Sequence, residues 1–120
     1  VAGGDVGVHL AARPGVRASL ANPTPYVENN VGGTQVLIEE MVKRDIHRLV
    51  FASSSSVYGS RVSGPFSEDD LALKPVSPYA ASKLAGEHVC RAAHVTWGWV
   101  ENPAQHDSSM DEIHARIFIC

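Results

Sequence analysis

The chain has 120 residues, 44% of them hydrophobic, and carries ten basic against thirteen acidic residues, for a net charge of −3. This length fits one domain at most, and the acidic balance excludes a protein that coats nucleic acid. No apolar run approaches the ~20 residues of a membrane span, and residues 1–5 lack the basic start of a signal peptide. Two cysteines do not make a disulfide framework, so we expect a cytoplasmic protein.

The first predicted elements are a short strand and the loop that ends it. Residues 6–12 form a short apolar segment, typical of a buried strand that runs into a loop. Residues 13–15, with the sequence Arg-Pro-Gly, end the strand. Pro23 and Pro25 then bar a regular helix until Tyr26.

A long helix is predicted over residues 26–45. Gly32 and Gly33 each weaken it by about 1 kcal/mol relative to alanine, and their small size suits close packing of this helix against a sheet. Spacings of three and four residues place one set of side chains on a single face. These are Thr34, Leu37, Ile38, Met41 and Val42.

A second strand and a second helix follow. Residues 49–51 form a continuous apolar run, typical of a strand buried on both faces of a parallel sheet. A loop is predicted over residues 61–76. Ser77 is expected to cap a helix over residues 79–94, with Pro78 in its first position. The order strand, helix, strand, helix predicts an α/β fold in which the two strands are parallel neighbours.

Two segments carry residues suited to catalysis. The serines within residues 53–59 directly follow the second strand, and ligands bind at the carboxyl ends of parallel strands. Tyr79 and Lys83 are four residues apart on a predicted helix, so their side chains share a face. A phenol of pKa about 10 is a poor base at neutral pH, and an ammonium about 5 Å away favours the phenolate by roughly 3 kcal/mol. Alone, this Tyr-x-x-x-Lys pattern is also typical of an amphipathic helix with a surface lysine.

Four motifs in a fixed order are more specific than any one of them. They are His-Leu-Ala-Ala at 9–12, Asn-Asn-Val-Gly-Gly-Thr at 29–34, Ser-Ser-Ser-Ser-Val-Tyr-Gly at 53–59 and Ser-Pro-Tyr-x-x-x-Lys at 77–83. With this order, residues 1–94 resemble the middle of the NAD-dependent epimerase/dehydratase family of extended short-chain dehydrogenases/reductases. The resemblance implies a partial Rossmann-like, doubly wound parallel sheet that binds NAD. Residues 11–17 look most like those of UDP-glucuronate 4-epimerases.

The resemblance also implies roles for individual residues. Tyr79 is the base and acid, Lys83 favours its phenolate and binds the nicotinamide ribose, and Ser54 takes the place of the family's catalytic serine or threonine. His9 is expected to pack beneath the cofactor site. Besides Tyr79 and Lys83, the residues expected to approach NAD are Ala11, Ala12, Asn29, Ala52 and Ser53.

The implied reaction is the transient oxidation of a UDP-sugar. Tyr79 takes the proton of the sugar 4-hydroxyl while the C4 hydride moves to NAD, and the 4-keto sugar then rotates and takes the hydride back on its other face. Dehydratases of the family usually carry Asp-Glu where this chain has Ser55 and Ser56. Epimerisation is therefore favoured over dehydration.

The resemblance further implies a homodimer, because related enzymes pair through the two helices that correspond to residues 26–45 and 79–94. No metal site is expected. Although His88 and Cys90 are close in sequence, they point to different faces of their helix.

The resemblance ends abruptly near residue 94. Residues 95–120 contain one basic and four acidic residues, and both tryptophans. We expect residues 1–94 to be a partial NAD-binding domain and residues 95–120 to be an unmatched tail, disordered or translated out of frame. The family's Gly-x-x-Gly-x-x-Gly loop is not in the sequence, so we expect an inactive, marginally stable fragment.

Three functional interpretations remain open at this point. The chain is the catalytic middle of a nucleotide-sugar epimerase, a non-catalytic fragment that pairs with an intact paralogue, or part of a related reductase that acts on a non-sugar alcohol.

Overall fold

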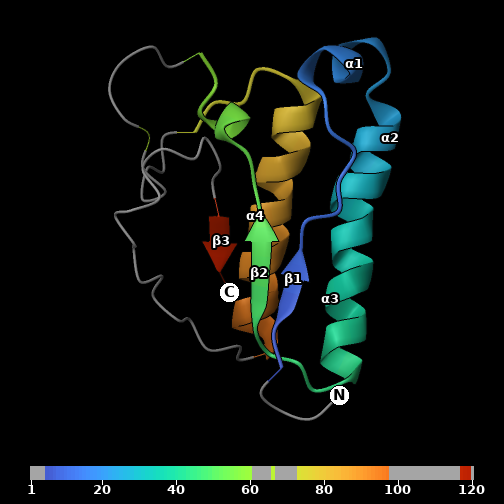
Figure 1. The fold of residues 1–120 in the computed structure, drawn as a ribbon, viewed down its shortest axis with the longest axis vertical. Coiled ribbons are helices and arrows are strands. Elements are labelled where there is room, and N and C mark those ends of the chain that lie inside the picture. The colour runs from blue at the N-terminus through green and yellow to red at the C-terminus, as the bar shows by residue number, and fades with distance from the viewer. Residues whose placement is uncertain (1–4, 61–65, 67–72, 98–116, 120) are drawn as a thin grey trace.

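A computed structural model of the chain describes residues 5–60, 66, 73–97 and 117–119. Three strands and a set of helices make up this part (Figure 1). In chain order they are β1 (Gly7–His9), α1 (Val16–Ala21), α2 (Thr24–Tyr26), the π-helix η1 (Val27–Gly32), α3 (Gly33–Lys43), β2 (Leu49–Ala52), the 3₁₀-helix η2 (Ser55–Tyr58), α4 (Pro78–Trp97) and β3 (Ile117–Ile119).

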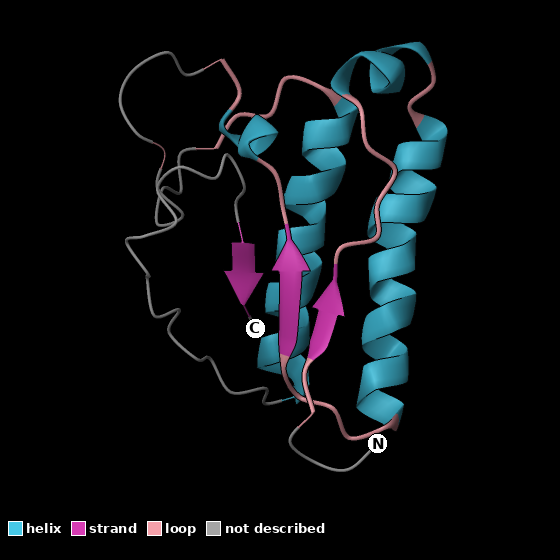
Figure 2. Cartoon of the chain, in the orientation of Figure 1, coloured by secondary structure: helices cyan, strands magenta, loops and turns pink. Residues whose placement is uncertain are grey.

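The sheet has the order β1-β2-β3. β1 and β2 are parallel neighbours, with Gly7 opposite Leu49 and His9 opposite Phe51, and the connection between them is helical (Figure 2). This arrangement confirms the α/β fold and the neighbouring parallel strands predicted from the sequence. β3 pairs with β2 in the antiparallel direction, and no pattern in the sequence indicated this third strand.

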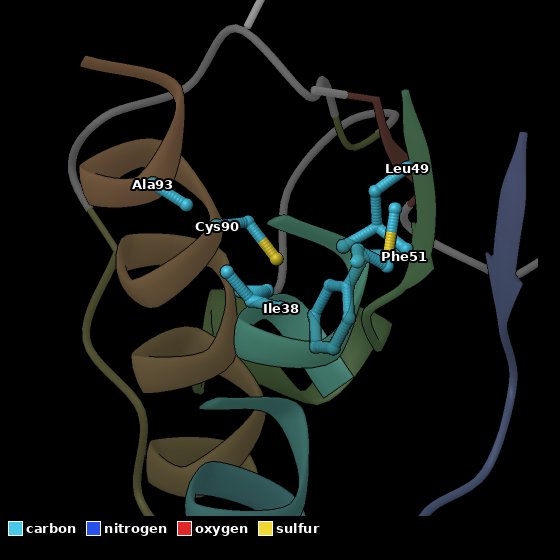
Figure 3. Packing of buried hydrophobic residues seen from close by; sticks show 6 residues of the cluster. Ile38, Leu49, Phe51, Cys90 and Ala93 are labelled. Carbon is cyan, nitrogen blue, oxygen red and sulfur yellow. The ribbon is translucent and has the colours of Figure 1, made fainter. Parts of the chain in front are cut away.

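The hydrophobic core lies on one face of the sheet. Leu49 and Phe51, which alternate with partly buried residues along β2, point into it. Both α3 and α4 pack on this face, and Figure 3 shows their side chains converging on the strand. The buried cluster consists of Ile38, Met41, Leu49, Phe51, Cys90 and Ala93.

The predicted long helix is confirmed, with a change of winding in its middle. α2, η1 and α3 form one continuous helical segment from Thr24 to Lys43, and the residues of η1 take π-helical hydrogen bonds. Ile38 and Met41 face the core, while Leu37 and Val42 lie beside it, so the predicted apolar face is the buried one. Short π segments within helices are frequent at functional sites.

The expected packing of Gly32 and Gly33 on the sheet is wrong. A Cβ built at either position would meet no atom within 4 Å, so both glycines border open space. The close approach occurs at Gly86 on α4 instead. A Cβ there would lie 2.5 Å from Cζ of Phe51, and only glycine lets this helix lie so near the strand.

Two further expectations need correction. The first strand is shorter than the predicted residues 6–12, because the chain leaves the sheet after His9. Helix α1 also precedes Tyr26, although Pro23 and Pro25 were expected to bar a regular helix there. The prolines lie outside α1, so they limit its length without preventing it.

The predicted start of α4 is confirmed. Ser77 accepts the backbone N–H of Ala80 with its hydroxyl, at 3.1 Å, and Pro78 is the first helical residue. The helix runs to Trp97, three residues past its predicted end. Among the described residues, no helix is both long and apolar enough to cross a membrane.

Candidate active site

The first turn of α4 carries Tyr79 and is held in place by α1. The backbone N–H of Tyr79 donates to Oγ of Ser19 at 3.1 Å, and this hydroxyl in turn donates to the carbonyl of Val16 at 2.6 Å. Ser19 is fully buried. A backbone donor that the helix leaves free is thereby satisfied from a distant segment, which fixes where the helix begins.

Asn30 connects three separate segments around Tyr79. Its Oδ1 accepts the backbone N–H of Arg13 at 2.7 Å, and its Nδ2 donates both to the Arg13 carbonyl at 3.1 Å and to Oγ of Ser82 at 2.9 Å. The Ser82 hydroxyl donates to the carbonyl of Tyr79 at 2.7 Å. Asn30 and Ser82 are each 2% exposed, so this network is shielded from water.

Lys83 lies one turn after Tyr79 and is 3% exposed. Its Nζ is 4.5 Å from the centre of the Phe51 ring. Burial lowers the pKa of Lys83 below its usual value, while nearby Cys90 and Glu87 act in the opposite direction. The surface lysine of the alternative interpretation is therefore excluded by the structure.

The Tyr79 ring lies against a second tyrosine. The rings of Tyr26 and Tyr79 meet edge to face, with their centres 6.3 Å apart. The Tyr26 hydroxyl donates to the carbonyl of Pro14 at 3.0 Å, which ties the loop after β1 to the helical segment. Tyr26 is 3% exposed, whereas Tyr79 is half-buried.

His9 ends β1 with a defined hydrogen bond. Its Nε2 lies 3.0 Å from Oγ1 of Thr34, and the Thr34 hydroxyl donates its proton to the carbonyl of Asn30 at 2.6 Å. Thr34 has no second proton, so Nε2 of His9 must be the donor. Burial, and secondarily the charge of Lys83, lowers the pKa of His9 and favours the neutral ring.

An open cleft of about 430 Å³ lies beside β1 and the helical segment. It brings together Ala11, Ala12 and Asn29, three of the residues expected to approach the cofactor. His9 is in its wall, as expected, and so are Arg13 and Gly33. A Cβ at Gly33 would meet no atom within 4 Å, so the absence of a side chain at this position leaves space in the cleft.

The serines after β2 form a second part of the candidate site. The hydroxyl of Ser54 accepts the backbone N–H of Ser56 at 3.2 Å, so it caps η2 and keeps its own proton to donate. η2 packs against α4, the helix of Tyr79 and Lys83. The buried Oγ of Ser53 has no hydrogen-bond partner within the described part of the chain. Ala52 is the last residue of β2, and Ser53 follows it with a hydroxyl that can still form a hydrogen bond to an additional group.

Gly59 closes the serine segment, and its backbone requires glycine. It has φ +67°, and a Cβ would lie 2.0 Å from the carbonyl oxygen of Lys74. The turn therefore keeps the segment after η2 close to the chain that leads into α4.

The residue types of the site suit a dinucleotide. Small residues line the cleft, and Ser53 after β2 has an unpartnered hydroxyl, while α4 carries the phenol of Tyr79 and the largely buried side chain of Lys83. Among the described residues there is no group of three or more His, Cys, Asp or Glu side chains placed to hold a metal ion.

Sequence reasoning missed Ser19, Asn30 and Ser82, which hold the turn that carries Tyr79. One signal was present: asparagine is a poor residue for a helix interior, so its place within a long helix indicates a side chain with a specific partner. The partners themselves are up to 60 residues away in sequence and could not be paired without the fold.

Comparisons with known proteins agree with this geometry. A UDP-glucuronate 4-epimerase of Thermodesulfobacterium geofontis is 47% identical over 91 residues, which cover 76% of this chain and 28% of that protein. The solved UDP-glucuronic acid 4-epimerase of Bacillus cereus, in complex with UDP-glucuronic acid and NAD, is 44% identical, with a TM-score of 0.72 over 78% of this chain and 30% of that one. A dTDP-glucose 4,6-dehydratase of Streptomyces venezuelae with NAD bound is also 44% identical, with a TM-score of 0.74 over 78% of this chain and 29% of that one.

The chain spans about three tenths of the length of these relatives. The profile of the NAD dependent epimerase/dehydratase family matches residues 1–100. Family members solved with NAD share the parallel strands and helices described above. The chain belongs to the NAD dependent epimerase/dehydratase family.

Proposed function

We propose that this chain is the catalytic segment of an NAD-dependent nucleotide-sugar 4-epimerase. The observation that carries the proposal is the first part of α4, where half-buried Tyr79 precedes the buried ammonium of Lys83 by one turn. The Tyr79 backbone donates to Ser19 and accepts from Ser82, and these two bonds hold the turn in place. Residues 1–94 form this segment; α4 continues three residues past it, to Trp97, and the strand at residues 117–119 pairs with β2.

NAD is the cofactor that fits this arrangement. Ala11, Ala12 and Asn29 in the cleft wall, with Ala52 and Ser53 at the end of β2, hold it. When bound, NAD would supply the acceptor for a hydride from the sugar and the donor for its return. Two hydrogen bonds between the Arg13 backbone and the Asn30 side chain fix the position of the loop after β1 in the cleft wall.

The proton is handled by the chain's own side chains. The Tyr79 side chain takes the proton of the sugar 4-hydroxyl as a phenolate and later gives it back as a phenol. The Lys83 ammonium favours the phenolate by charge. Ser54 accepts a backbone bond with its oxygen, so its proton is available to donate to the sugar oxygen.

Epimerisation is favoured over dehydration by two residues. Dehydratases of the family usually carry an acid and a base where this chain has Ser55 and Ser56. Serine hydroxyls do not supply the carboxyl groups that would remove water from the sugar. The substrate class that fits best is a UDP-sugar, since the epimerases similar to this chain include proteins named for UDP-glucuronate.

A segment exchange tests this proposal. The matched 91 residues of the Thermodesulfobacterium geofontis epimerase are replaced by those of this chain. We expect the chimera to convert UDP-glucuronate to its 4-epimer, and Tyr79→Phe in the chimera to lower kcat about 10²- to 10⁴-fold because the base is lost. Tyr26→Phe is the matched control, since it removes a phenol that contacts Tyr79 without being placed at the sugar.

A folded chimera that binds NAD but does not epimerise the sugar would contradict the proposal. A product that has lost water would instead assign the segment to the dehydratases.

A pairing role is the second candidate. Val27 and Val36 on the first helical segment, and Val95 and Trp97 at the end of α4, are between 41% and 76% exposed. We infer that the helices over residues 26–45 and 79–94 form a subunit interface, with a second copy or with an intact relative. Sedimentation of the chain beside a Val36→Glu variant tests this: a wild-type dimer that the charge dissociates supports pairing, and a wild-type monomer argues against it.

A further inference from the structure

Phe51 occupies an unusual place for a core residue, because a charged group lies over its face. The ring is 1% exposed and is part of the buried cluster on the covered side of the sheet. Nζ of Lys83 lies 4.5 Å from the ring centre, well inside the ~6 Å range of a cation–π contact.

The ring itself cannot turn away. Its Cζ edge abuts Gly86, where an added Cβ would lie only 2.5 Å from the ring. The imidazole of His9 lies on another side, with the ring centres 5.7 Å apart and tilted by 47°. Strand β2 fixes the backbone of Phe51 between its two neighbours in the sheet. The position of the aromatic face is therefore set by the fold.

The Lys83 ammonium has little else to hold it. Within the described part of the chain it forms no hydrogen bond or ion pair, although it is 3% exposed. Glu87 and Cys90 face it from its own helix, and His9 faces it from β1 with a ring that is favoured neutral. A cation on a largely buried side chain loses part of its hydration, and a ring face supplies attraction without a proton acceptor.

We propose that Phe51 is a positioning residue for Lys83, whose ammonium its ring face holds in the buried site beside Tyr79. The importance of this for catalysis rests on the proposed function, because Lys83 is the cation assigned to the phenolate and the ribose. The aromatic contact itself is independent of that function. Its loss would leave the ammonium of Lys83 less stable and less confined.

The contact is testable in this chain without cofactor or substrate. The chain has three lysines, and Lys43 and Lys74 are exposed internal references for NMR of the lysine ε-methylene groups. We expect the Lys83 ε protons to be shifted upfield by the Phe51 ring current, unlike those of the two references. A Lys83 signal that coincides with the references, as an open or unfolded site would give, overturns the proposal.

Fluorination separates the charge of the ring face from its shape. Phenylalanine fluorinated at one or both δ carbons replaces Phe51, because the ζ and ε carbons face Gly86 and are too crowded to modify. Fluorine withdraws electron density from the face, so we expect the pKa of Lys83 to fall stepwise, by about 0.2 to 0.7 in total. The same replacements at Phe66, whose ring stacks on Tyr58, are the matched control and should leave Lys83 unchanged.

If the pKa of Lys83 does not respond to fluorination of Phe51, the ring contributes packing alone, and the proposal is overturned. Failure of the proposed epimerase function would not affect this result, since the measurement contains neither NAD nor sugar.

Discussion

The two faces of the sheet are built from the same strands and have opposite surroundings. On one face, Leu49 and Phe51 are no more than 1% exposed under α3 and α4. On the other, Val8 of β1 is 63% exposed, its flanking residues Val6 and Leu10 are 47% and 70% exposed, and no described helix lies over them. In Figure 1 α4 lies behind β2, and α3 is seen to the side of β1.

This difference shows that the composition of a strand does not reveal which of its faces is buried. An apolar run has a side chain on each face, and only neighbouring elements decide which face becomes core. The covered face also holds His9, Lys83 and the residues that fix them, so the candidate chemistry depends on the packed side. The bare apolar side agrees with the marginal stability expected from the sequence, which stays a prediction.

The largest effect is expected from truncation on the covered face. Leu49→Ala should lower the free energy of unfolding by about 2–5 kcal/mol, because it leaves a cavity where the side chain is fully buried. Urea denaturation measures the change. A loss below about 1 kcal/mol would mean that α3 and α4 do not pack on this strand as described.

Overpacking the same face should cost less. Gly86→Ala places a methyl group 2.5 Å from the Phe51 ring and should lower the free energy of unfolding by about 1–3 kcal/mol. Gly32→Ala is the matched control, because its Cβ meets open space in a helical segment. That substitution should stabilise by about 0.5–1 kcal/mol, so two glycine-to-alanine changes are expected to have opposite signs.

A smaller, pH-dependent effect is expected from His9. Its pKa in the folded chain is lowered from the ordinary 6.5, so the unfolded chain takes up the proton first as the pH falls. The stabilisation from a neutral His9 is complete above 6.5 and is lost as the pH falls from 6.5 through the folded pKa.

Urea unfolding between about pH 8 and pH 5 measures this loss. His9→Gln should flatten the pH dependence of stability in that window, because it removes the imidazole whose pKa is lowered in the folded chain. An unchanged slope in the His9 variant would show that the imidazole is not buried against Lys83 and Phe51.

The smallest effect is expected on the bare face. Val8→Thr keeps the β-branched shape at a side chain that is 63% exposed, so the free energy of unfolding should change by less than about 0.5 kcal/mol. A loss comparable to that of Leu49→Ala would mean that another part of the chain or a second copy covers this face. Sedimentation at several concentrations would then distinguish these two cases.

Much of the candidate site was visible in the order of residues. The Tyr-x-x-x-Lys spacing fixes Tyr79 and Lys83 on one helical face, and the serines follow a strand where parallel sheets bind ligands. The clustering of Ala11, Ala12 and Asn29 needed the fold, because the loop and the helical segment are joined by the bonds of Asn30 and Tyr26 to residues far away in the sequence. The roles of these residues stay predictions until the chimera is assayed.

The sequence alone determined the α/β class, the capped start of α4 and the apolar face of the first long helix, because these follow from periodicity and local backbone chemistry. Only the tertiary structure decided that Gly86 rather than Gly33 lets a helix approach the sheet, that Ser19 and Asn30 hold the turn of Tyr79, and that Lys83 lies over Phe51. These are contacts between residues far apart in the chain. Their partners are chosen by packing in three dimensions, which no spacing along a single sequence records.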